Sequence, residues 1–308
     1  MTFNSVYLFC IFAKTSFTAA DEDVILITGG YNGSNFLSTC EVLPSPCSVP
    51  SFPGNVFSAP HYSHTTARTA DGLILTCGGI NNSRKCLMLD LQSNSWISHS
   101  RLDQSRISST AVTMSEGLFL FGDDLYDETT SSFLPTGSTE WEKGPTPPGD
   151  GITGACGVVV SEFRFLLIGG RHTPNQVVEY NMKTGQWLLW PELVKGRGMV
   201  VCAKQGDNII MSGGENDSST SILHIPSRQE RRAGDMNSVR GSYFHMIELN
   251  GNVFAIGGDN GYEYLDSIEE WNNEHETWEM TEMHMKTARY SFSVTAGPQA
   301  RLCQSTLL

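Results

Sequence analysis

A glycine pair that follows a short apolar run recurs along this chain and sets the frame for its fold. The first example is the run 24–28 followed by Gly29-Gly30, and the later pairs are Gly78-Gly79, a degenerate Gly122-Asp123, Gly169-Gly170, Gly213-Gly214 and Gly257-Gly258. The first glycines of successive pairs are 49, 44, 47, 44 and 44 residues apart. Self-similarity at a period of roughly 40 to 50 residues is typical of repeat architectures. The sequence therefore predicts six units of one design.

Each unit has the features of a small antiparallel sheet. The runs before the glycine pairs, such as 73–77 and 253–256, are short and rich in β-branched, aliphatic and aromatic residues, which predicts buried strands. Asn-Gly or Asp-Gly dipeptides, which favour hairpin turns, precede several runs, so an earlier strand pairs with each of them. A third strand follows, and then a tryptophan: Trp96, Trp141 and Trp187 lie 17, 18 and 17 residues after their pairs, and Trp278 lies 20 after. Four-stranded sheets repeated around an axis are the blades of a β-propeller.

With these motifs the chain resembles the kelch-repeat propellers, whose blades carry the double glycine, an aromatic residue in the third strand and a spaced tryptophan. The resemblance covers residues 21–297 and implies an all-β, six-bladed propeller with four-stranded antiparallel blades. Three blades depart from it: blade one lacks a tryptophan near Val49, blade five has Arg231 at that place, and blade three has Asp123 as its second glycine. Residues 289–295 match the first strands of other blades, so we expect the C-terminal strand to complete blade one and remove an open edge.

The two ends of the chain differ from the repeat. Residues 6–13 are eight apolar residues, and Thr18-Ala19-Ala20 offers small residues where a signal peptidase would cut, although no Lys or Arg precedes the apolar core. We therefore expect a signal peptide at 1–20, a propeller at 21–297 and a tail at 298–308, in a secreted protein. The alternatives are an N-terminal extension that packs on the propeller and a remnant of a longer gene product. No apolar run is long enough to span a membrane.

Sequons and cysteines favour the same compartment. The sequons begin at Asn32, Asn81 and Asn216, each just after a glycine pair, which predicts glycosylation in exposed loops. Cys77 with Cys86, and Cys40 with Cys47, are close enough in sequence to form local bridges. Cys156 and Cys202 lie in matching first strands and are predicted to be buried thiols. Without Cys10 seven cysteines remain, so at least one, such as Cys303, stays free or pairs elsewhere.

Charge limits the class of partner. The chain has 20 Lys and Arg against 33 Asp and Glu, a formal net charge of −13. Nucleic acids and anionic membranes require a basic face, so neither is expected as a partner. Acidity also keeps a secreted protein soluble, and this is its simpler explanation.

Arginines recur in the repeat and suggest a site. Arg106, Arg197 and Arg240 precede their glycine pairs by 16, 16 and 17 residues, and Arg289 holds the matching place in the closing strand. Four guanidinium groups on one face would recognise carboxylate or sulfate, and Tyr62, Tyr243 and Tyr290 would flank them. His61 is a further flanking candidate. The loop residues expected to line the same or a neighbouring rim are Tyr31, Asn32, Asn81, Arg171, His172, Glu215, Asn216, Asp259 and Asn260. The alternative role is structural, since arginine at this point in kelch repeats can bind backbone carbonyls or neighbouring acids and hold blades together.

Motifs of catalysis are missing from the sequence. The eight histidines show no metal-ligand spacing, and there is no CxxC, GxSxG, P-loop or dinucleotide fingerprint. We therefore expect neither metal nor cofactor. By family analogy the predicted function is that of a non-enzymatic, monomeric, secreted kelch propeller that binds a protein or a glycan through its loop face. The alternatives are a cytoplasmic substrate-recognition propeller of a ubiquitin-ligase adaptor, which requires a truncated gene model, and a kelch-type enzyme acting on an acidic sugar.

Overall fold

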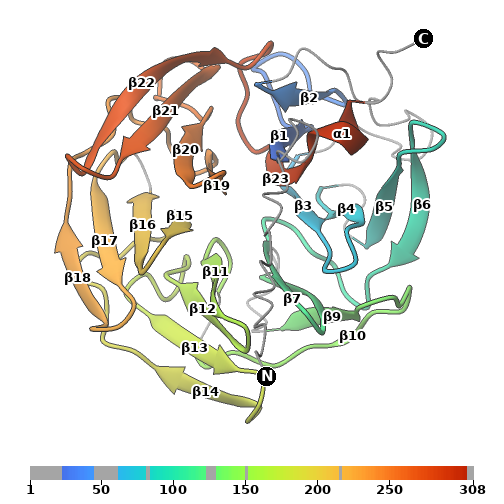
Figure 1. Ribbon diagram of the computed structural model, residues 1–308, viewed down its shortest axis with the longest axis horizontal. Coiled ribbons are helices and arrows are strands. Elements are labelled where there is room, and N and C mark those ends of the chain that lie inside the picture. Colours follow the sequence, from blue (N-terminus) through green and yellow to red (C-terminus); the bar gives the residue numbers. More distant parts are fainter. Residues whose placement is uncertain are drawn as a thin grey trace, which may run out of the picture.

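Six β-sheets stand around a central axis in the computed structural model, which describes residues 23–44, 62–80, 84–122, 130–149, 152–214 and 217–303 (Figure 1). Blades two to six each contain four antiparallel strands, and the predicted propeller is confirmed. In every one of these blades the first strand in sequence lies nearest the axis and the fourth lies outermost.

The strands of blades two to six follow the chain in order. Blades two and three consist of β3 (His64–Arg68), β4 (Ile74–Gly78), β5 (Lys85–Asp90) and β6 (Ser95–Arg101), then β7 (Thr110–Met114), β8 (Gly117–Phe121), β9 (Ser131–Pro135) and β10 (Glu142–Lys143). Blade four consists of β11 (Cys156–Ser161), β12 (Arg164–Ile168), β13 (Val177–Asn181) and β14 (Gln186–Leu189). Blades five and six consist of β15 (Val200–Gln205), β16 (Asn208–Gly213), β17 (Thr220–His224) and β18 (Gln229–Arg232), then β19 (His245–Leu249), β20 (Asn252–Ile256), β21 (Ser267–Asn272) and β22 (Thr277–His284).

Blade one closes the ring with strands from both ends of the chain. Its described strands are β1 (Asp23–Thr28), β2 (Cys40–Leu43) and β23 (Ser293–Pro298), in the order β2-β1-β23. β23 pairs antiparallel with β1 over its whole length, from Asp23 opposite Pro298 to Thr28 opposite Ser293. The predicted closure by the C-terminal strand is therefore confirmed. A short helix, α1 (Gln299–Leu302), follows β23.

The core lies between neighbouring blades, where the bulky residues of the repeat meet. Trp96 and Trp278 are buried in inter-blade clusters with the apolar faces of the second and third strands. Trp278 lies opposite Trp271 across the β21–β22 pair, with ring centroids 5.3 Å apart. Tyr180 and Trp187 repeat this pairing in blade four at 4.8 Å. Aromatic pairs at this spacing add to the stability that burial provides.

The glycine pairs are required because the next blade passes close to them. Gly169 has a φ of +66°, and a Cβ placed on it would lie 2.6 Å from the carbonyl oxygen of Arg197 in blade five. Gly257 has a φ of +60°, and its Cβ would lie 2.9 Å from the carbonyl oxygen of Arg289. Any other residue would meet both the strain of a left-handed backbone and a collision with the neighbouring blade. The repeated glycines therefore lie where the backbones of neighbouring blades are in closest contact.

Candidate functional site

The four repeated arginines lie inside the blades rather than on a rim. Their exposed fractions are 1% for Arg106, 2% for Arg197, 0% for Arg240 and 1% for Arg289. In each case Nη1 donates to the carbonyl of the first glycine of the arginine's own blade, at 3.4 Å to Gly122, 2.7 Å to Gly213, 2.8 Å to Gly257 and 2.8 Å to Gly29. Nη1 also donates to a carbonyl at the start of the third strand: those of Thr130, Ser219 and Thr39, which directly precede the strand, and that of Ser267, its first residue in blade six.

The main chain of the same arginines joins neighbouring blades. The carbonyl of Arg106 accepts a hydrogen bond from Gly79 N of blade two at 2.8 Å, and the carbonyl of Arg289 accepts one from Gly258 N of blade six at 3.0 Å. The side chain thus fixes one blade while the backbone holds the preceding one. With their guanidinium groups buried and used in this way, the arginines do not form the anion-binding rim suggested by the sequence, and their geometry corresponds to the structural alternative.

An aromatic patch gathers at one edge of the propeller. We use this name for Tyr31, Phe36, Tyr62, Tyr243, Tyr264 and Tyr290, which come from blades one, two and six. Tyr264 stacks on Tyr290 with centroids 5.0 Å apart, and Phe36 stacks on Tyr62 at 4.5 Å. Tyr31 contacts Tyr264 and Tyr290 edge-on, each at 5.8 Å. The six rings therefore form one connected surface.

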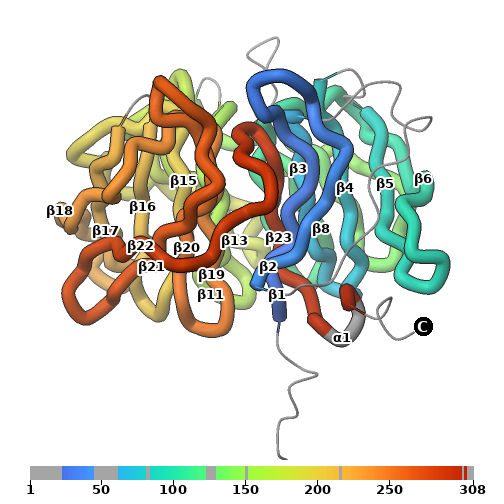
Figure 2. Tube along the Cα trace, turned by 90° about the horizontal axis from the view of Figure 1, so that it is seen from above, coloured from blue at the N-terminus to red at the C-terminus, as the bar shows by residue number. Residues whose placement is uncertain are grey.

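Two equivalent loops position the patch. The β1–β2 loop and the β20–β21 loop project from the same edge of the ring, which we call the upper rim (Figure 2). Asn32 Oδ1 accepts from Ser34 N and Asn35 N, and Asn260 Oδ1 accepts from Tyr262 N and Glu263 N, so both loops are held by the same asparagine turn. Each loop then places an aromatic residue six positions after its second glycine: Phe36 and Tyr264.

The rings of the patch are partly exposed and uncharged. Phe36 is 41% exposed, and the other five rings are half-buried. Burial raises the pKa of the Tyr290 phenol, and the nearby Tyr264, Tyr62, Tyr243 and Tyr31 raise it further. Burial and the carboxylate of Asp259 raise the pKa of Tyr264. The patch is therefore a neutral aromatic surface at neutral pH.

The structure brings some predicted residues together and leaves others apart. Tyr62, Tyr243 and Tyr290, predicted beside the arginines, all belong to the patch, as does Tyr31. Asn32, Asp259 and Asn260 lie on the loops that carry it, whereas Arg171 and His172 lie on the corresponding loop of blade four. His61, Asn81, Glu215, Asn216 and Cys47 lie outside the described residues. Sequence reasoning missed Phe36 and Tyr264, although their shared distance from the glycine pair was a usable signal.

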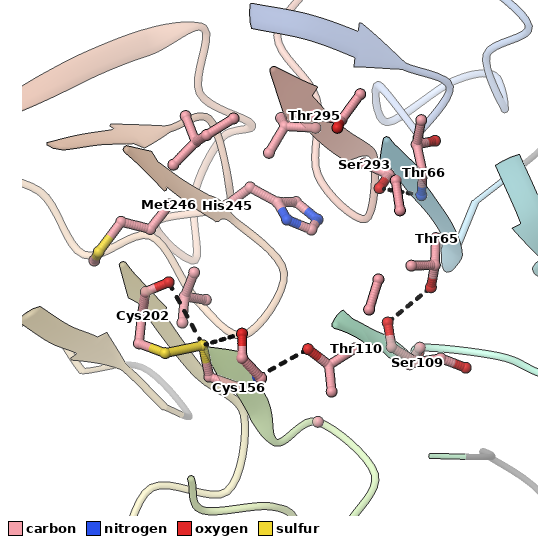
Figure 3. A pocket seen from close by; sticks show the side chains of 18 of the residues that line it. Thr65, Thr66, Ser109, Thr110, Cys156, Cys202, His245, Met246, Ser293 and Thr295 are labelled. Carbon is pink, nitrogen blue, oxygen red and sulfur yellow. Dashed lines mark hydrogen bonds between the residues drawn. A yellow bond between two sulfur atoms is a disulfide. The ribbon is translucent and has the colours of Figure 1, made fainter. Parts of the chain in front are cut away.

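A central channel opens beside the patch. The cavity has a volume of about 600 Å³ and is lined by the innermost strands (Figure 3). Tyr243 of the aromatic patch is among its lining residues. Serine and threonine hydroxyls dominate the polar lining: Ser63, Thr65, Thr66, Ser108, Ser109, Thr110, Ser291, Ser293 and Thr295. The Oγ atoms of Ser63 and Ser291 lie 2.9 Å apart at the upper end.

Two histidines face this channel and are neutral. Burial and, to a smaller extent, the nearby His245 together lower the pKa of His64 to about 3. Burial lowers the pKa of His245 to about 4. Thr28 Oγ1 lies 2.9 Å from Nε2 of His64, and the ring of His245 packs against Phe292 at 5.1 Å. The described residues contain no group of three or more His, Cys, Asp or Glu that could hold a metal ion.

The disulfides confirm one sequence prediction and correct two. Cys77 and Cys86 are bonded, as predicted, across the β4–β5 pair. Cys156 and Cys202, predicted to be thiols, form a disulfide that ties β11 of blade four to β15 of blade five (Figure 3). Cys40, predicted to pair with Cys47, is a free thiol whose pKa burial raises to about 12. The Cys156–Cys202 bond forms because the inner strands of adjacent blades approach closely, although the two cysteines are 46 residues apart in sequence.

The closed ring of six antiparallel sheets, with glycine pairs at the contacts between blades, defines the chain as a six-bladed β-propeller. The Kelch motif family model matches residues 240–281, which comprise most of blade six. The other blades repeat the same design, so the chain is a six-bladed propeller with a kelch motif in blade six, and kelch propellers typically serve as protein-binding modules. No curated protein matches the chain. In the part of the chain that the structure describes, no helix is long and apolar enough to cross a membrane.

Proposed function

We propose that the protein is a secreted, non-enzymatic and monomeric binding module that takes a protein or glycan ligand on the aromatic patch of its upper rim. The observation that carries this proposal is the connected surface of six partly exposed rings. Aromatic side chains supply large contact areas with little conformational entropy to lose, and they are enriched where partners bind. A connected aromatic surface that stays partly exposed is a feature of an interaction site.

Two features support the extracellular part of the proposal. The described residues contain two disulfides, Cys77–Cys86 and Cys156–Cys202. Disulfides persist in oxidising compartments and are rare in cytosolic proteins. The sequon at Asn32 lies on a rim loop, where Ser34 and Asn35 are exposed. Expression in secretory eukaryotic cells tests this part by intact mass before and after glycan removal and reduction. We expect cleavage near Ala20, attached glycans and bonded cysteines; an unprocessed chain with free thiols would contradict secretion.

The patch itself is tested with a double variant, Phe36→Ser with Tyr264→Ser. These rings come from the two equivalent loops, and we expect their loss to weaken binding of the fluorescent, tetramerised protein to cell surfaces at least about tenfold. The matched control is Leu188→Ser with Leu189→Ser, which removes two exposed apolar side chains from the outer strand β14 of blade four. We expect the control to bind as the parent does.

Folding must be checked in the same experiment, since Tyr264 also packs against Gly33. The melting temperatures of the double variant and of Phe36→Ser alone are measured beside the binding curves. Phe36→Ser removes the most exposed ring of the patch and should reduce binding without a change in melting temperature. Full binding by both folded variants would overturn the proposed function.

A further inference from the structure

We propose that the ligand is a neutral saccharide whose outer rings stack on the aromatic patch while its terminal ring enters the hydroxyl-lined upper mouth of the central channel. This inference rests on the proposed function and names the chemistry of its ligand. Patch and channel are continuous, because Tyr243 belongs to both and Ser63 and Ser291 directly follow Tyr62 and Tyr290. A ligand that lies on the rings therefore meets the channel mouth next.

The rings suit the faces of a sugar. A pyranose ring has a face of C–H groups and an edge of hydroxyls, and the electron-rich face of a phenol attracts the C–H groups. Phe36, which is 41% exposed, and the half-buried Tyr264 stand on two separate loops, so the patch offers rings to more than one sugar unit. Neutral rings also bring no charge that would have to be desolvated when the sugar binds.

The channel mouth suits the edges of a sugar. Ser63, Ser108 and Ser291 have φ values of 58°, 52° and 54°, in the left-handed region that residues other than glycine rarely adopt. Their backbones form a collar: Ser291 N donates to the carbonyl of Tyr243, Ser63 N to that of Ser291, and Ser108 N to that of Ser63. Strained backbone held in this way is found where a site needs fixed groups. Each serine hydroxyl can both donate and accept, as each sugar hydroxyl can.

Charge at the mouth argues for a neutral ligand. Besides the phenol of Tyr243, the ionisable side chains that line the channel are His64, His245, Arg68 and Glu248. Burial keeps both histidines neutral, and Arg68 ends β3 while Glu248 lies near the end of β19, both at the far end of the inner strands. On the β20–β21 loop, which carries Tyr264 of the patch, the carboxylate of Asp259 is used within the loop itself, because its Oδ1 accepts a hydrogen bond from Gly261 N. The buried arginines remove the reason to expect an acidic sugar.

The test is a printed array of neutral, sialylated, sulfated and amino glycans. The protein carries Ser34→Ala, so that no glycan on Asn32 can cover the patch while the asparagine turn is kept. Beside it runs the same protein with Ser63→Gly and Ser291→Gly, which removes the two hydroxyls yet suits the positive φ at both positions. We expect binding to neutral glycans that falls at least about tenfold in the glycine variant, with an unchanged melting temperature.

Three results would overturn the inference. Binding confined to charged glycans would show that charge, not the hydroxyl collar, selects the ligand. Binding to no glycan, while the Phe36 and Tyr264 double variant still loses cell-surface binding, would assign the patch to a protein ligand and leave the proposed function standing. Equal binding of neutral glycans by the parent and the glycine variant would exclude the channel mouth from the site.

Discussion

Blades one and six differ from blades three and five in what accompanies the same arginine. In blade six Arg240 Nη2 lies 2.9 Å from Glu269, and neither side chain is exposed. In blade one Arg289 Nη2 pairs with the buried Glu41 at 2.5 Å. Blade three has Ser132 at this place of the third strand, and blade five has Ser221.

The acid in blades three and five comes instead from a loop at the surface. Arg197 Nη1 lies 3.6 Å from Asp217, a partly exposed carboxylate that also pairs with Lys195 at 2.6 Å. Arg106 Nε donates to Ser132 Oγ, which in turn donates to Asp103. The constant feature of all four blades is thus the pair of carbonyls that the guanidinium binds. The comparison teaches that these carbonyl bonds define the arginine's role, whereas the buried acid is an addition of two blades.

The largest expected effect comes from removing the arginine of a buried pair. Arg240→Ala leaves Glu269 charged and without its ion pair in the core, which should lower the free energy of unfolding by about 3 to 5 kcal/mol. Arg197→Ala leaves Asp217 with Lys195 and with solvent, so we expect about half that loss. Urea unfolding of both variants at pH 7 measures the difference. Equal losses would mean that the carbonyl bonds alone stabilise the blades.

A smaller loss of stability is expected from changing the residue that faces the arginine in the third strand, which is Glu269 in blade six and Ser221 in blade five. Glu269→Gln keeps the shape of the side chain but removes the charge that faces Arg240 and replaces one of the two oxygens that accept from Arg240 Nε and Asn237 N with a donor, and we expect a loss of about 3 kcal/mol. Ser221→Ala in blade five removes one long hydrogen bond from Arg197 Nη2, at 3.4 Å, and should cost about 1 kcal/mol or less. Guanidinium chloride unfolding compares the pair. The prediction is wrong if the serine variant loses as much as the glutamine variant.

A further test concerns blade two, which has Tyr62 where blades one, three, five and six have the arginine. Its inner strand is tied to blade one through the hydroxyl of Thr28, which contacts both His64 and Thr66. The pKa of His64 is lowered to about 3, so the unfolded chain takes up this proton below about pH 6.5 while the folded protein does not. Stability is therefore complete above pH 6.5 and is lost as the pH falls toward 3.

At pH 5 this loss should reach about 2 kcal/mol relative to pH 7. His64→Gln keeps a hydrogen-bonding side chain but has no proton to take up. Its free energy of unfolding, measured in urea at both pH values, should change about 2 kcal/mol less than that of the parent. The same pH dependence in parent and variant would remove His64 as the cause.

The ring could be predicted from the sequence because its determinants are local and repeated. Gly169 of the pair Gly169-Gly170 must be glycine because its φ is positive and because the backbone of Arg197 lies too close for a side chain. Glycine pairs recur in other blades at a spacing near 44 residues. The match of residues 289–295 to other first strands identified the closure for the same reason. These features depend on one position of the repeat at a time.

The site could be predicted only in part, because it depends on which neighbours face one another. The sequence shows that the four arginines recur at one position of the repeat, which suggests a binding rim. It does not show that the backbone around them buries their side chains. Tyr62, Tyr243 and Tyr290 were found as their neighbours, yet Phe36 reaches Tyr62 only through the meeting of blades one and two. The Cys156–Cys202 bond likewise joins two blades, and no local spacing reports such a contact.

The pairing of β1 with β23 also sets an order of events during synthesis. Thr28 and Ser293 are hydrogen-bonded partners 265 residues apart in sequence. At a synthesis rate of about 5 to 20 residues per second, β1 waits roughly 15 to 50 s on the ribosome before its inner neighbour has been made. During that time blade one lacks the strand that lines the axis, although later blades can already fold. A ligand that contacts both Tyr31 and Tyr290 can therefore bind only after β23 has been synthesised and has paired with β1.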